Sequence, residues 1–376
     1  MVDINEMIKI ARRYNNKKRS YLLVNTMQAK HVPVRPQDIT LGANLGRKIR
    51  EEYPNAHFVI GFAETATAIA TDVAWEVSTP AEEVYDRKGI FINTTRENFV
   101  PDGDCICFQE EHSHAVNQKL YIKNFAEYLK DTKEVILVDD EISTGKTLFN
   151  IIQELRNKIP ELAERDFVVG SIVNRLTPER IEFFKQNRIY FVSLYNIQWT
   201  DEMLEKDFRN LSAPTELSTI PDKAPDFMKL AIPDARYFID IFDYILECTY
   251  IADRIARNID FSGCKDVLFL GTEECMYPSI ITASLLEQHG KFNAYCHSTT
   301  RSPVCISNEN DYPMQNGYQI RSLYDVERVN YIYNLRKYDM VIVISDAKNP
   351  DPKALAILDA VLAENGIEKR FYFMGE

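Results

Sequence analysis

The side chains best suited to chemistry lie in one short stretch, residues 135–147, which reads VILVDDEISTGKT. An apolar run typical of a buried strand leads into two adjacent carboxylates, Asp139 and Asp140, which a small glycine-containing turn follows. A helix is expected over residues 147–158, so backbone N–H groups of the turn can converge on a phosphate at the positive end of the helix dipole. The two carboxylates would then reach ribose hydroxyls. The N–H groups concerned belong to Ser143, Thr144, Gly145, Lys146 and Thr147.

The end of this stretch, STGKT, also resembles the phosphate loop of P-loop nucleotide-binding proteins. That loop has the pattern G-x-x-x-x-G-K-T, and here Asp140 stands where the first glycine is required. A carboxylate at that position would repel the phosphates, so the sequence disfavours a P-loop. A non-catalytic nucleotide-like fold and a coincidental strand, turn and helix remain as alternatives.

A second candidate loop follows the strand expected over residues 57–61. The strand ends at Gly61, and a helix rich in small residues follows the loop. This repeats the strand, loop and helix order of the first stretch and makes the loop a candidate for function. An ordinary packed helix start is the alternative. The loop residues of interest are Gly61, Ala63, Glu64 and Thr65.

A third group of polar residues follows the strand expected over residues 89–93. Arg96 is the cationic residue of the sequence TTRE. The long polar connection after it ends in EEHSHA and carries His112 and His114. A metal site formed by Glu110, Glu111, His112 and His114 is one alternative for this connection, and an exposed surface loop is the other.

An early loop carries further polar side chains at Gln28, Lys30, His31 and Arg35. These residues could line a pocket for an acceptor substrate, with Lys30 as the candidate residue that binds it, or they could form a solvated loop. Glu141 is a weaker candidate for a group that faces the acceptor, because Ser143 is a poor general base without a partner.

The bulk properties restrict the class of protein. A chain of 376 residues is long enough for about two domains, and 45% hydrophobic with 27% charged residues is ordinary for a globular protein. The formal net charge of −12 argues against binding to nucleic acid or to an anionic membrane. Seven cysteines, with no signal-peptide pattern and no apolar run of membrane-spanning length, favour a reducing cytoplasm. The expected partners are therefore small molecules.

The candidate loops must be positioned by alternating strands and helices. Further strands are expected at residues 167–173 and 189–194, with a helix over residues 178–185 between them. An earlier helix is expected over residues 38–52. This order predicts a parallel, doubly wound α/β sheet with ligands at the carboxyl ends of its strands.

A proline-rich segment, residues 199–236, reads as a linker or irregular cover and predicts a domain boundary near residue 228. The predicted domains are therefore residues 1–228 and 229–376. An amphipathic helix is expected at the start of the second domain, over residues 237–258.

The second domain repeats the order of features in the first. VLFLGTEEC, HSTTRSP and MVIVISD follow one another as VIGFAETAT, INTTREN and VILVDD do. We therefore expect a second, smaller α/β domain that is a degenerate duplicate of the first. Its phosphate turn is replaced by AKNPDPK, which has no glycine and two prolines that lack N–H groups. It is either a structural relic or a ligand-binding domain that uses Glu273, Glu274, Arg301 and Ser302.

The segment VDDEISTGKT, preceded by GFAETATA and TTRE, resembles the signature of type I, orotate-type phosphoribosyltransferases. The tetrad Thr300, Arg301, Ser302 and Pro303, together with QAKHVPV and EEHSHA, extends the resemblance over nearly the full chain. The whole is similar to phosphoribosyltransferases fused to a C-terminal TRSP domain, a family associated with tellurite resistance and stress.

The resemblance implies an α/β enzyme that transfers ribose 5-phosphate from phosphoribosyl diphosphate (PRPP) to a base or amine, in the synthesis of a nucleoside-like metabolite. It implies Mg²⁺ near Asp139 and Asp140, held mostly through substrate and water. It further implies that the loop from Gly61 to Thr65 and Arg96 bind pyrophosphate, and that His112 and His114 serve as a general acid or as further pyrophosphate contacts. It also implies a homodimer. A non-catalytic regulatory protein that binds PRPP is the competing hypothesis.

Overall fold

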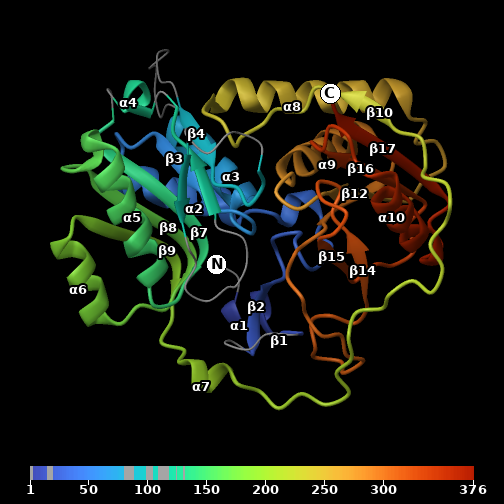
Figure 1. Cartoon of the computed structure of the whole chain (residues 1–376), viewed down its shortest axis with the longest axis horizontal. Helices are drawn as coiled ribbons and strands as arrows, with labels where there is room; N and C mark the ends of the chain where they lie inside the picture. Colours follow the sequence, from blue (N-terminus) through green and yellow to red (C-terminus); the bar gives the residue numbers. More distant parts are fainter. Residues whose placement is uncertain are drawn as a thin grey trace. The chain divides into compact units, whose positions relative to one another are not determined.

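The computed structural model describes residues 3–14, 20–79, 89–98, 105–108, 118–123, 125–129 and 132–376 (Figure 1). The chain forms two compact units. We call the unit of Thr40–Thr200 and Asp234–Ile245 the first unit. The second unit comprises the remainder, which is Met1–Ile39, Asp201–Pro233 and Leu246–Glu376.

The first unit is built on a six-stranded sheet of mixed direction. Five neighbouring strands are parallel, and the short edge strand β11 pairs antiparallel with β4. The strands in spatial order are β11 (Ile239–Asp240), β4 (Ile90–Asn93), β3 (Phe58–Gly61), β7 (Glu134–Ile142), β8 (Asp166–Asn174) and β9 (Ile189–Asn196).

Helices connect the parallel strands of the first unit, as the alternating sequence pattern predicted. In α2, Leu41, Leu45 and Ile49 fall at helical spacing and all three are buried. The main helices are α2 (Leu41–Glu52), α3 (Thr67–Ser78), α5 (Lys146–Lys158) and α6 (Pro178–Gln186). Shorter elements are α4 (Phe125–Tyr128), η3 (Pro160–Leu162) and an antiparallel hairpin of β5 (Cys105–Phe108) and β6 (Gln118–Tyr121).

The core of the first unit explains why β7 could be recognised from sequence. Residues 135–138 of β7 are fully buried, and Val135 and Leu137 pack in the cluster that contains the apolar face of α5. The strand leaves this apolar environment at Asp139, which is only half-buried. The two carboxylates therefore stand where the strand emerges from the core.

The second unit is built on a five-stranded, entirely parallel sheet. Its strands in spatial order are β10 (Met228–Leu230), β17 (Lys369–Gly375), β16 (Met340–Ser345), β12 (Asp266–Gly271) and β13 (Asn293–Ser298). Its helices are α9 (Tyr277–His289), α10 (Pro352–Glu364) and the part of α8 (Ile241–Asn258) from Leu246 onward. An antiparallel hairpin is formed by β14 (Gly317–Arg321) and β15 (Val329–Tyr333).

Two segments distant in sequence complete the second unit. The N-terminal segment contributes α1 (Ile4–Met7), the antiparallel strands β1 (Ile8–Arg12) and β2 (Tyr21–Asn25), and η1 (Pro36–Asp38). Val34 exchanges backbone hydrogen bonds with Cys296 of β13. The proline-rich segment contains α7 (Asp201–Leu204) and β10, and its Thr215 bonds to the backbone of Gly317. The proline-rich segment is thus an irregular cover of the second unit.

The two units share one topology (Figure 1). The strand order β4-β3-β7-β8 of the first sheet matches β13-β12-β16-β17 of the second. In the first unit the order of the main elements along the chain is β3, α3, β4, the hairpin of β5 and β6, β7, α5 and β8. In the second unit the order is β12, α9, β13, the hairpin of β14 and β15, β16, α10 and β17. The repeated order of sequence features thus corresponds to a repeated order of elements.

Two details differ from the sequence expectation. Residues 237–240 were expected to be helical, but α8 begins at Ile241, because Ile239 and Asp240 pair with the free edge of β4. The compact units also do not divide at a single position near residue 228, since both the N-terminal segment and the proline-rich segment bond to the second sheet. No helix among the described residues combines the length and apolar character that crossing a membrane requires.

Candidate functional site

The loops that follow β3 and β7 meet at the carboxyl edge of the first sheet. β3 and β7 are neighbours, and the connections that follow them lead to opposite sides of the sheet, to β4 and to β8. This is the topological switch point where open α/β sheets bind ligands. The Thr65 hydroxyl donates a hydrogen bond of 3.1 Å to Oδ1 of Asp140, so the loop after β3 is joined directly to the carboxyl end of β7.

The turn after β7 has the backbone geometry that anion binding requires. Gly145 is the N-cap residue of α5 and has φ of +68°, a conformation that side chains disfavour. A Cβ atom on Gly145 would also lie 2.7 Å from the Phe184 ring. Glycine is therefore required at this position on two counts. Residues 143–147 precede or open the 13-residue helix, so their N–H groups lie at its positive end.

The adjacent carboxylates differ in their surroundings. Asp139 Oδ1 accepts a hydrogen bond of 2.9 Å from the backbone N–H of Asp140. Desolvation by the surrounding protein raises the pKa of Asp140 above its ordinary value, and the charge of Glu141 adds to the rise. Side-chain hydrogen bonds between Asp140 and both Asp139 and Thr65 oppose the shift. The ionised form of the Asp140 carboxyl is thus disfavoured, and a bound cation or a hydroxyl donor would stabilise it.

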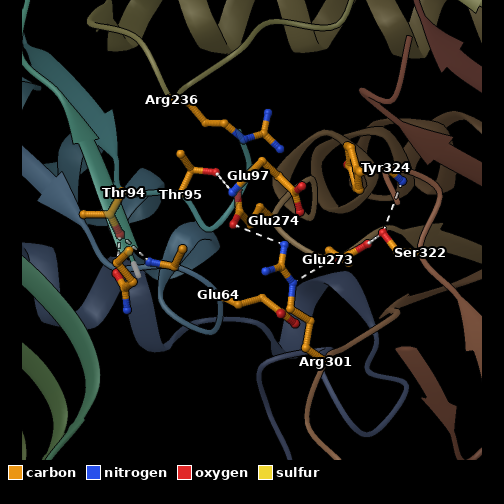
Figure 2. Close-up of polar contacts among 12 residues, drawn as sticks. Glu64, Thr94, Thr95, Glu97, Arg236, Glu273, Glu274, Arg301, Ser322 and Tyr324 are labelled. Carbon is orange, nitrogen blue, oxygen red and sulfur yellow. Dashed lines mark hydrogen bonds and ion pairs between the residues drawn. The ribbon is translucent and has the colours of Figure 1, made fainter. Parts of the chain in front are cut away.

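The loop after β3 is fixed by buried hydrogen bonds. The N–H of Ala63 donates to the Thr94 hydroxyl over 2.9 Å, and that hydroxyl donates to Gln118 over 2.7 Å (Figure 2). Glu64 is buried in the same loop, and the Ala63–Glu64 peptide bond is cis. Because Thr94 directly follows β4 and Gln118 belongs to β6, these two elements hold the loop in place.

The residues after β4 include the expected cation. Arg96 is half-buried and follows Thr95, whose backbone exchanges hydrogen bonds with Lys119 of β6. The Thr95 hydroxyl accepts a hydrogen bond of 3.0 Å from the N–H of buried Glu97. Arg96 therefore stands on a rigid turn at the carboxyl edge. His112 and His114 lie outside the described residues.

Arg236 is a cationic residue at this edge that the sequence analysis missed. The N–H of Asn93, the last residue of β4, donates to the carbonyl of Ala235 over 2.6 Å. Arg236 is only 5% exposed and pairs with Asp234 over 3.1 Å. The expected helix over residues 237–258 concealed the short strand β11, which brings Arg236 beside the end of β4.

Glu141 does not present a carboxylate for acid–base work. Its Oε1 lies 2.9 Å from Nη1 of Arg175, and both side chains are largely buried. The Nε of Arg175 donates to the carbonyl of Trp199 over 2.8 Å. Glu141 thus forms an ion pair that links β7 to Arg175, the residue directly after β8.

The carboxylate oxygens at the carboxyl edge of the first sheet fit a metal ion that takes its other ligands from water and substrate. Asp139 and Asp140 supply two adjacent carboxylates, and the described part of the chain contains no group of three or more histidine, cysteine or acidic side chains placed to enclose a metal. Mg²⁺ commonly binds through one or two carboxylates together with water and substrate phosphates. The residues present therefore fit Mg²⁺ and do not fit a closed structural metal site.

Comparison with known families decides the class. The protein-family model described as phosphoribosyl transferase matches residues 7–198. A second family model, described as the TRSP domain C-terminal to that transferase, matches residues 247–362. The chain belongs to the phosphoribosyl transferase family. The match confirms the expected fusion of a phosphoribosyltransferase segment with a TRSP domain. No curated protein matched the chain.

Two solved structures are among those found to be similar. Adenine phosphoribosyltransferase from Thermoanaerobacter pseudethanolicus is 12% identical, with a TM-score of 0.33 over 52% of this chain and 98% of the other. The Giardia lamblia adenine phosphoribosyltransferase in complex with 9-deazaadenine is 15% identical, with a TM-score of 0.33 over 51% and 95%. We draw no conclusion from likeness at this TM-score.

The TRSP domain lies within the second unit and contains most of the other predicted ligand residues. Glu273 is 1% exposed and its Oε2 lies 2.8 Å from Nε of Arg301. Glu274 Oε1 lies 3.8 Å from Nη2 of the same arginine. Lys30, from the N-terminal segment, is fully buried and donates to the Glu273 carbonyl over 2.6 Å. Ser302 accepts a hydrogen bond at its backbone carbonyl from Tyr333.

The early loop is therefore not a solvated loop. Gln28, Lys30 and His31 are all buried. Arg35 forms an ion pair with Glu287 of α9. In the structure, Lys30 and Arg301 both contact Glu273, and no local pattern in the sequence could have predicted this arrangement.

The carboxyl edges of the two sheets match residue by residue. Thr94 donates its N–H to Gly61, and Thr299 donates to Gly271. The Thr299 hydroxyl accepts the N–H of Glu273 over 3.0 Å, as Thr94 accepts that of Ala63. Glu273, Arg301 and Asp346 thus occupy the places of Ala63, Arg96 and Asp140. The TRSP domain adds three further side chains at this edge, which are Ser322, Tyr324 and Arg328.

Proposed function

We propose that this protein is a Mg²⁺-dependent phosphoribosyltransferase that transfers ribose 5-phosphate from PRPP to a base or amine. The main observation in its support is the hydrogen bond from Thr65 to Asp140, which joins the loop that would hold the diphosphate to the carboxyl end of β7, whose carboxylates would hold the ribose. The family match supports phosphoribosyl transfer in general. The metal, the acceptor and the roles of single residues are part of the proposal.

Each part of PRPP has a matching feature in the first unit. The N–H groups of residues 143–147 would bind the 5-phosphate at the start of α5. Asp139 and Asp140 would accept hydrogen bonds from the ribose hydroxyls. The loop Gly61–Thr65 and Arg96 would bind pyrophosphate, with Arg236 as a second cation at the end of β4.

Mg²⁺, when bound, would neutralise charge on the diphosphate and so favour its departure. Asp139 and Asp140 would hold it largely through water molecules and the substrate. Because ionised Asp140 is disfavoured by desolvation, binding of a cation should release a proton from this carboxyl at a pH near its raised pKa.

The reaction breaks the bond between C1′ and the pyrophosphate oxygen, and the electron pair leaves with pyrophosphate. The acceptor nitrogen forms the new bond to C1′ and loses its proton. The rigid loops after β3 and β7 contribute by holding donor and acceptor in line and by placing N–H groups and cations where charge develops. Since Glu141 is paired with Arg175, we assign it no part in removing the proton.

The cellular setting belongs to the proposal as well. We expect a cytoplasmic homodimer that makes a nucleoside-like metabolite in tellurite resistance or stress. Its partners would be PRPP and an unidentified acceptor, without nucleic acid or membrane.

The donor half of the proposal is tested by calorimetric titration of PRPP with and without Mg²⁺. We expect binding that requires Mg²⁺ and is lost in the Asp139→Asn/Asp140→Asn variant, whose folding is checked by circular dichroism. The matched control is Asp166→Asn, which changes a carboxylate at the opposite end of the same sheet. Absence of PRPP binding to the folded wild type would refute the proposal.

The transfer half is tested by pyrophosphate release from PRPP in the presence of a panel of nucleobases and amines. Release that depends on one acceptor and on Asp139 and Asp140 supports transfer. Tight PRPP binding without release for any acceptor would instead support the regulatory, non-catalytic alternative.

A further inference from the structure

A buried polar cluster lies at the carboxyl edge of the second sheet, mostly within the TRSP domain, and Figure 2 shows its residues Glu273, Glu274, Arg301 and Ser322. We call it the Glu273 cluster. Its central carboxylate is 1% exposed, and its two arginine side chains are 11% and 17% exposed. Its members are Lys30, Glu273, Glu274, Arg301, Ser322 and Arg328.

A single carboxylate oxygen organises both arginines. Oε2 of Glu273 lies 2.8 Å from Nε of Arg301 and 3.1 Å from Nη2 of Arg328. The other oxygen, Oε1, accepts a hydrogen bond of 2.5 Å from Ser322, whose hydroxyl also accepts from Arg328 over 2.6 Å. Two guanidinium groups are thus held in fixed orientations before any ligand arrives, which is the preorganisation that bidentate recognition of an oxyanion needs.

The backbone at this position is held in an uncommon conformation. Glu273 has φ of +51°, although it is not glycine. Such a residue persists only where its surroundings fix it, and here Lys30 bonds its carbonyl and Thr299 its N–H. In the first unit the equivalent residue is Ala63, which carries no carboxylate. The TRSP domain has therefore added an anchor for cations at the place of the pyrophosphate loop.

The cluster is not arranged for PRPP. Asp346, at the place of Asp140, accepts a hydrogen bond from the hydroxyl of Tyr324, which takes the position proposed for a ribose hydroxyl in the first unit. The place of Asp139 is taken by Ser345, which is fully buried and bonded to Thr272. The turn that follows contains two prolines and so offers fewer N–H groups to a phosphate.

The arrangement of charges nevertheless suits an anion. Two like-charged guanidinium groups that meet at one oxygen atom repel each other, and a second anionic group between them would reduce that repulsion. Their side chains remain partly exposed while the carboxylate beneath them is buried. The cluster also lies beside the switch point between β12 and β16, where ligands bind in sheets of this kind.

We propose that the Glu273 cluster binds a small molecule through an anionic group, either a phosphate or a carboxylate, that contacts Arg301 and Arg328. Glu273 and Ser322 are positioning residues that hold the arginines. This site differs from the one proposed for PRPP, so it is tested in protein whose first-site carboxylates are removed. Because the phosphate turn of residues 143–147 remains in that protein, only binding that depends on Arg328 is assigned to the Glu273 cluster.

The test is calorimetric titration of two probes, inorganic phosphate and succinate, into the Asp139→Asn/Asp140→Asn variant. We expect saturable binding of at least one probe, and the probe that binds more tightly identifies the anionic group as phosphate or carboxylate. Adding Arg328→Gln should weaken that binding about tenfold or more, because a charge-assisted hydrogen bond is lost. Arg328→Lys should restore part of the affinity, since it keeps the charge but not the planar fork.

Arg370→Gln is the matched control in the same background. Arg370 forms a partly buried ion pair with Asp359 at the opposite end of β17, so its loss should not alter anion binding. If Arg328→Gln reduces folding, the comparison rests on Arg328→Lys. The proposal is overturned if neither probe binds the folded first-site variant, or if the probe binds Arg328→Gln and Arg328→Lys as tightly as the parent.

Discussion

The carboxyl edges of the two sheets carry different chemistry on the same topology. At one edge, two adjacent carboxylates precede a glycine turn at the start of α5. At the other, a serine and a tyrosine-bonded aspartate precede a turn that contains prolines, and a buried glutamate holds two arginines. The fold supplies the position of each loop, while a few side chains decide what the loop can bind.

The largest expected effect comes from the central carboxylate of the second edge. Glu273→Gln should lower the free energy of unfolding of the second unit by about 3–5 kcal/mol, because two partly exposed arginines lose the buried carboxylate that they share as counter-ion. Glu287→Gln is the control, since it breaks a more exposed ion pair and should cost about 1 kcal/mol or less.

The measurement can separate the two units. Both tryptophans, Trp75 and Trp199, belong to the first unit, so their fluorescence follows its unfolding, whereas circular dichroism follows both units. We expect Glu273→Gln to shift the circular dichroism transition and to leave the tryptophan transition in place. A loss no larger than that of Glu287→Gln would show that the cluster does not hold the second edge together.

A smaller effect is expected at the phosphate turn of the first edge. Gly145→Ala should destabilise the protein by about 1–3 kcal/mol through its positive φ. It should also weaken PRPP binding about 100-fold, because the turn must move away from Phe184 and its N–H groups lose their alignment.

Gly263→Ala separates these two causes. Gly263 also has positive φ, at +77°, but a Cβ atom there would meet nothing within 4 Å. This control should lose stability through backbone strain alone and keep wild-type PRPP affinity. Equal PRPP affinity in Gly145→Ala and Gly263→Ala would contradict the assignment of the phosphate turn.

The smallest effects concern pH, and they should have opposite signs in the two units. Desolvation raises the pKa of Asp140, so its ionisation costs stability once the pH exceeds the ordinary aspartate pKa of about 4. Asp140→Asn should therefore raise the melting temperature at neutral pH, and the gain should vanish as the pH falls below that value.

Asp339 in the second unit gives the opposite case. Backbone N–H groups of Asp266 and Lys265 lower the pKa of its carboxyl, so its ionised form stabilises the fold. Asp339→Asn should lower the melting temperature at neutral pH, and the difference should shrink as the pH falls through the lowered pKa. Melting curves of both variants across the acidic range check the two signs, and a common sign would contradict the account.

The parts of the fold that were predictable from sequence are those with a local cause. The strand that ends at Asp139 was recognisable because its apolar residues are continuous and buried, and the glycine turn followed from backbone geometry. The repeated order of motifs also predicted a second α/β domain. In each case neighbouring residues supply the signal.

The parts that were not predictable depend on residues distant in sequence. Residues 237–240 fit a helical pattern, yet Ile239 pairs with β4 because that strand has a free edge. Arg236 and Arg328 gave no local signal, since each acquires its surroundings only through the folded chain. Lys30 meets Glu273 across more than half of the sequence for the same reason.

The most direct test of the central claim is the stoichiometry of PRPP binding with Mg²⁺ present, measured by calorimetry. The account predicts one PRPP per chain in the wild type, none in Asp139→Asn/Asp140→Asn, and one in Arg328→Gln. Two PRPP molecules per wild-type chain, or binding that survives in the first-site variant and disappears in Arg328→Gln, would contradict it.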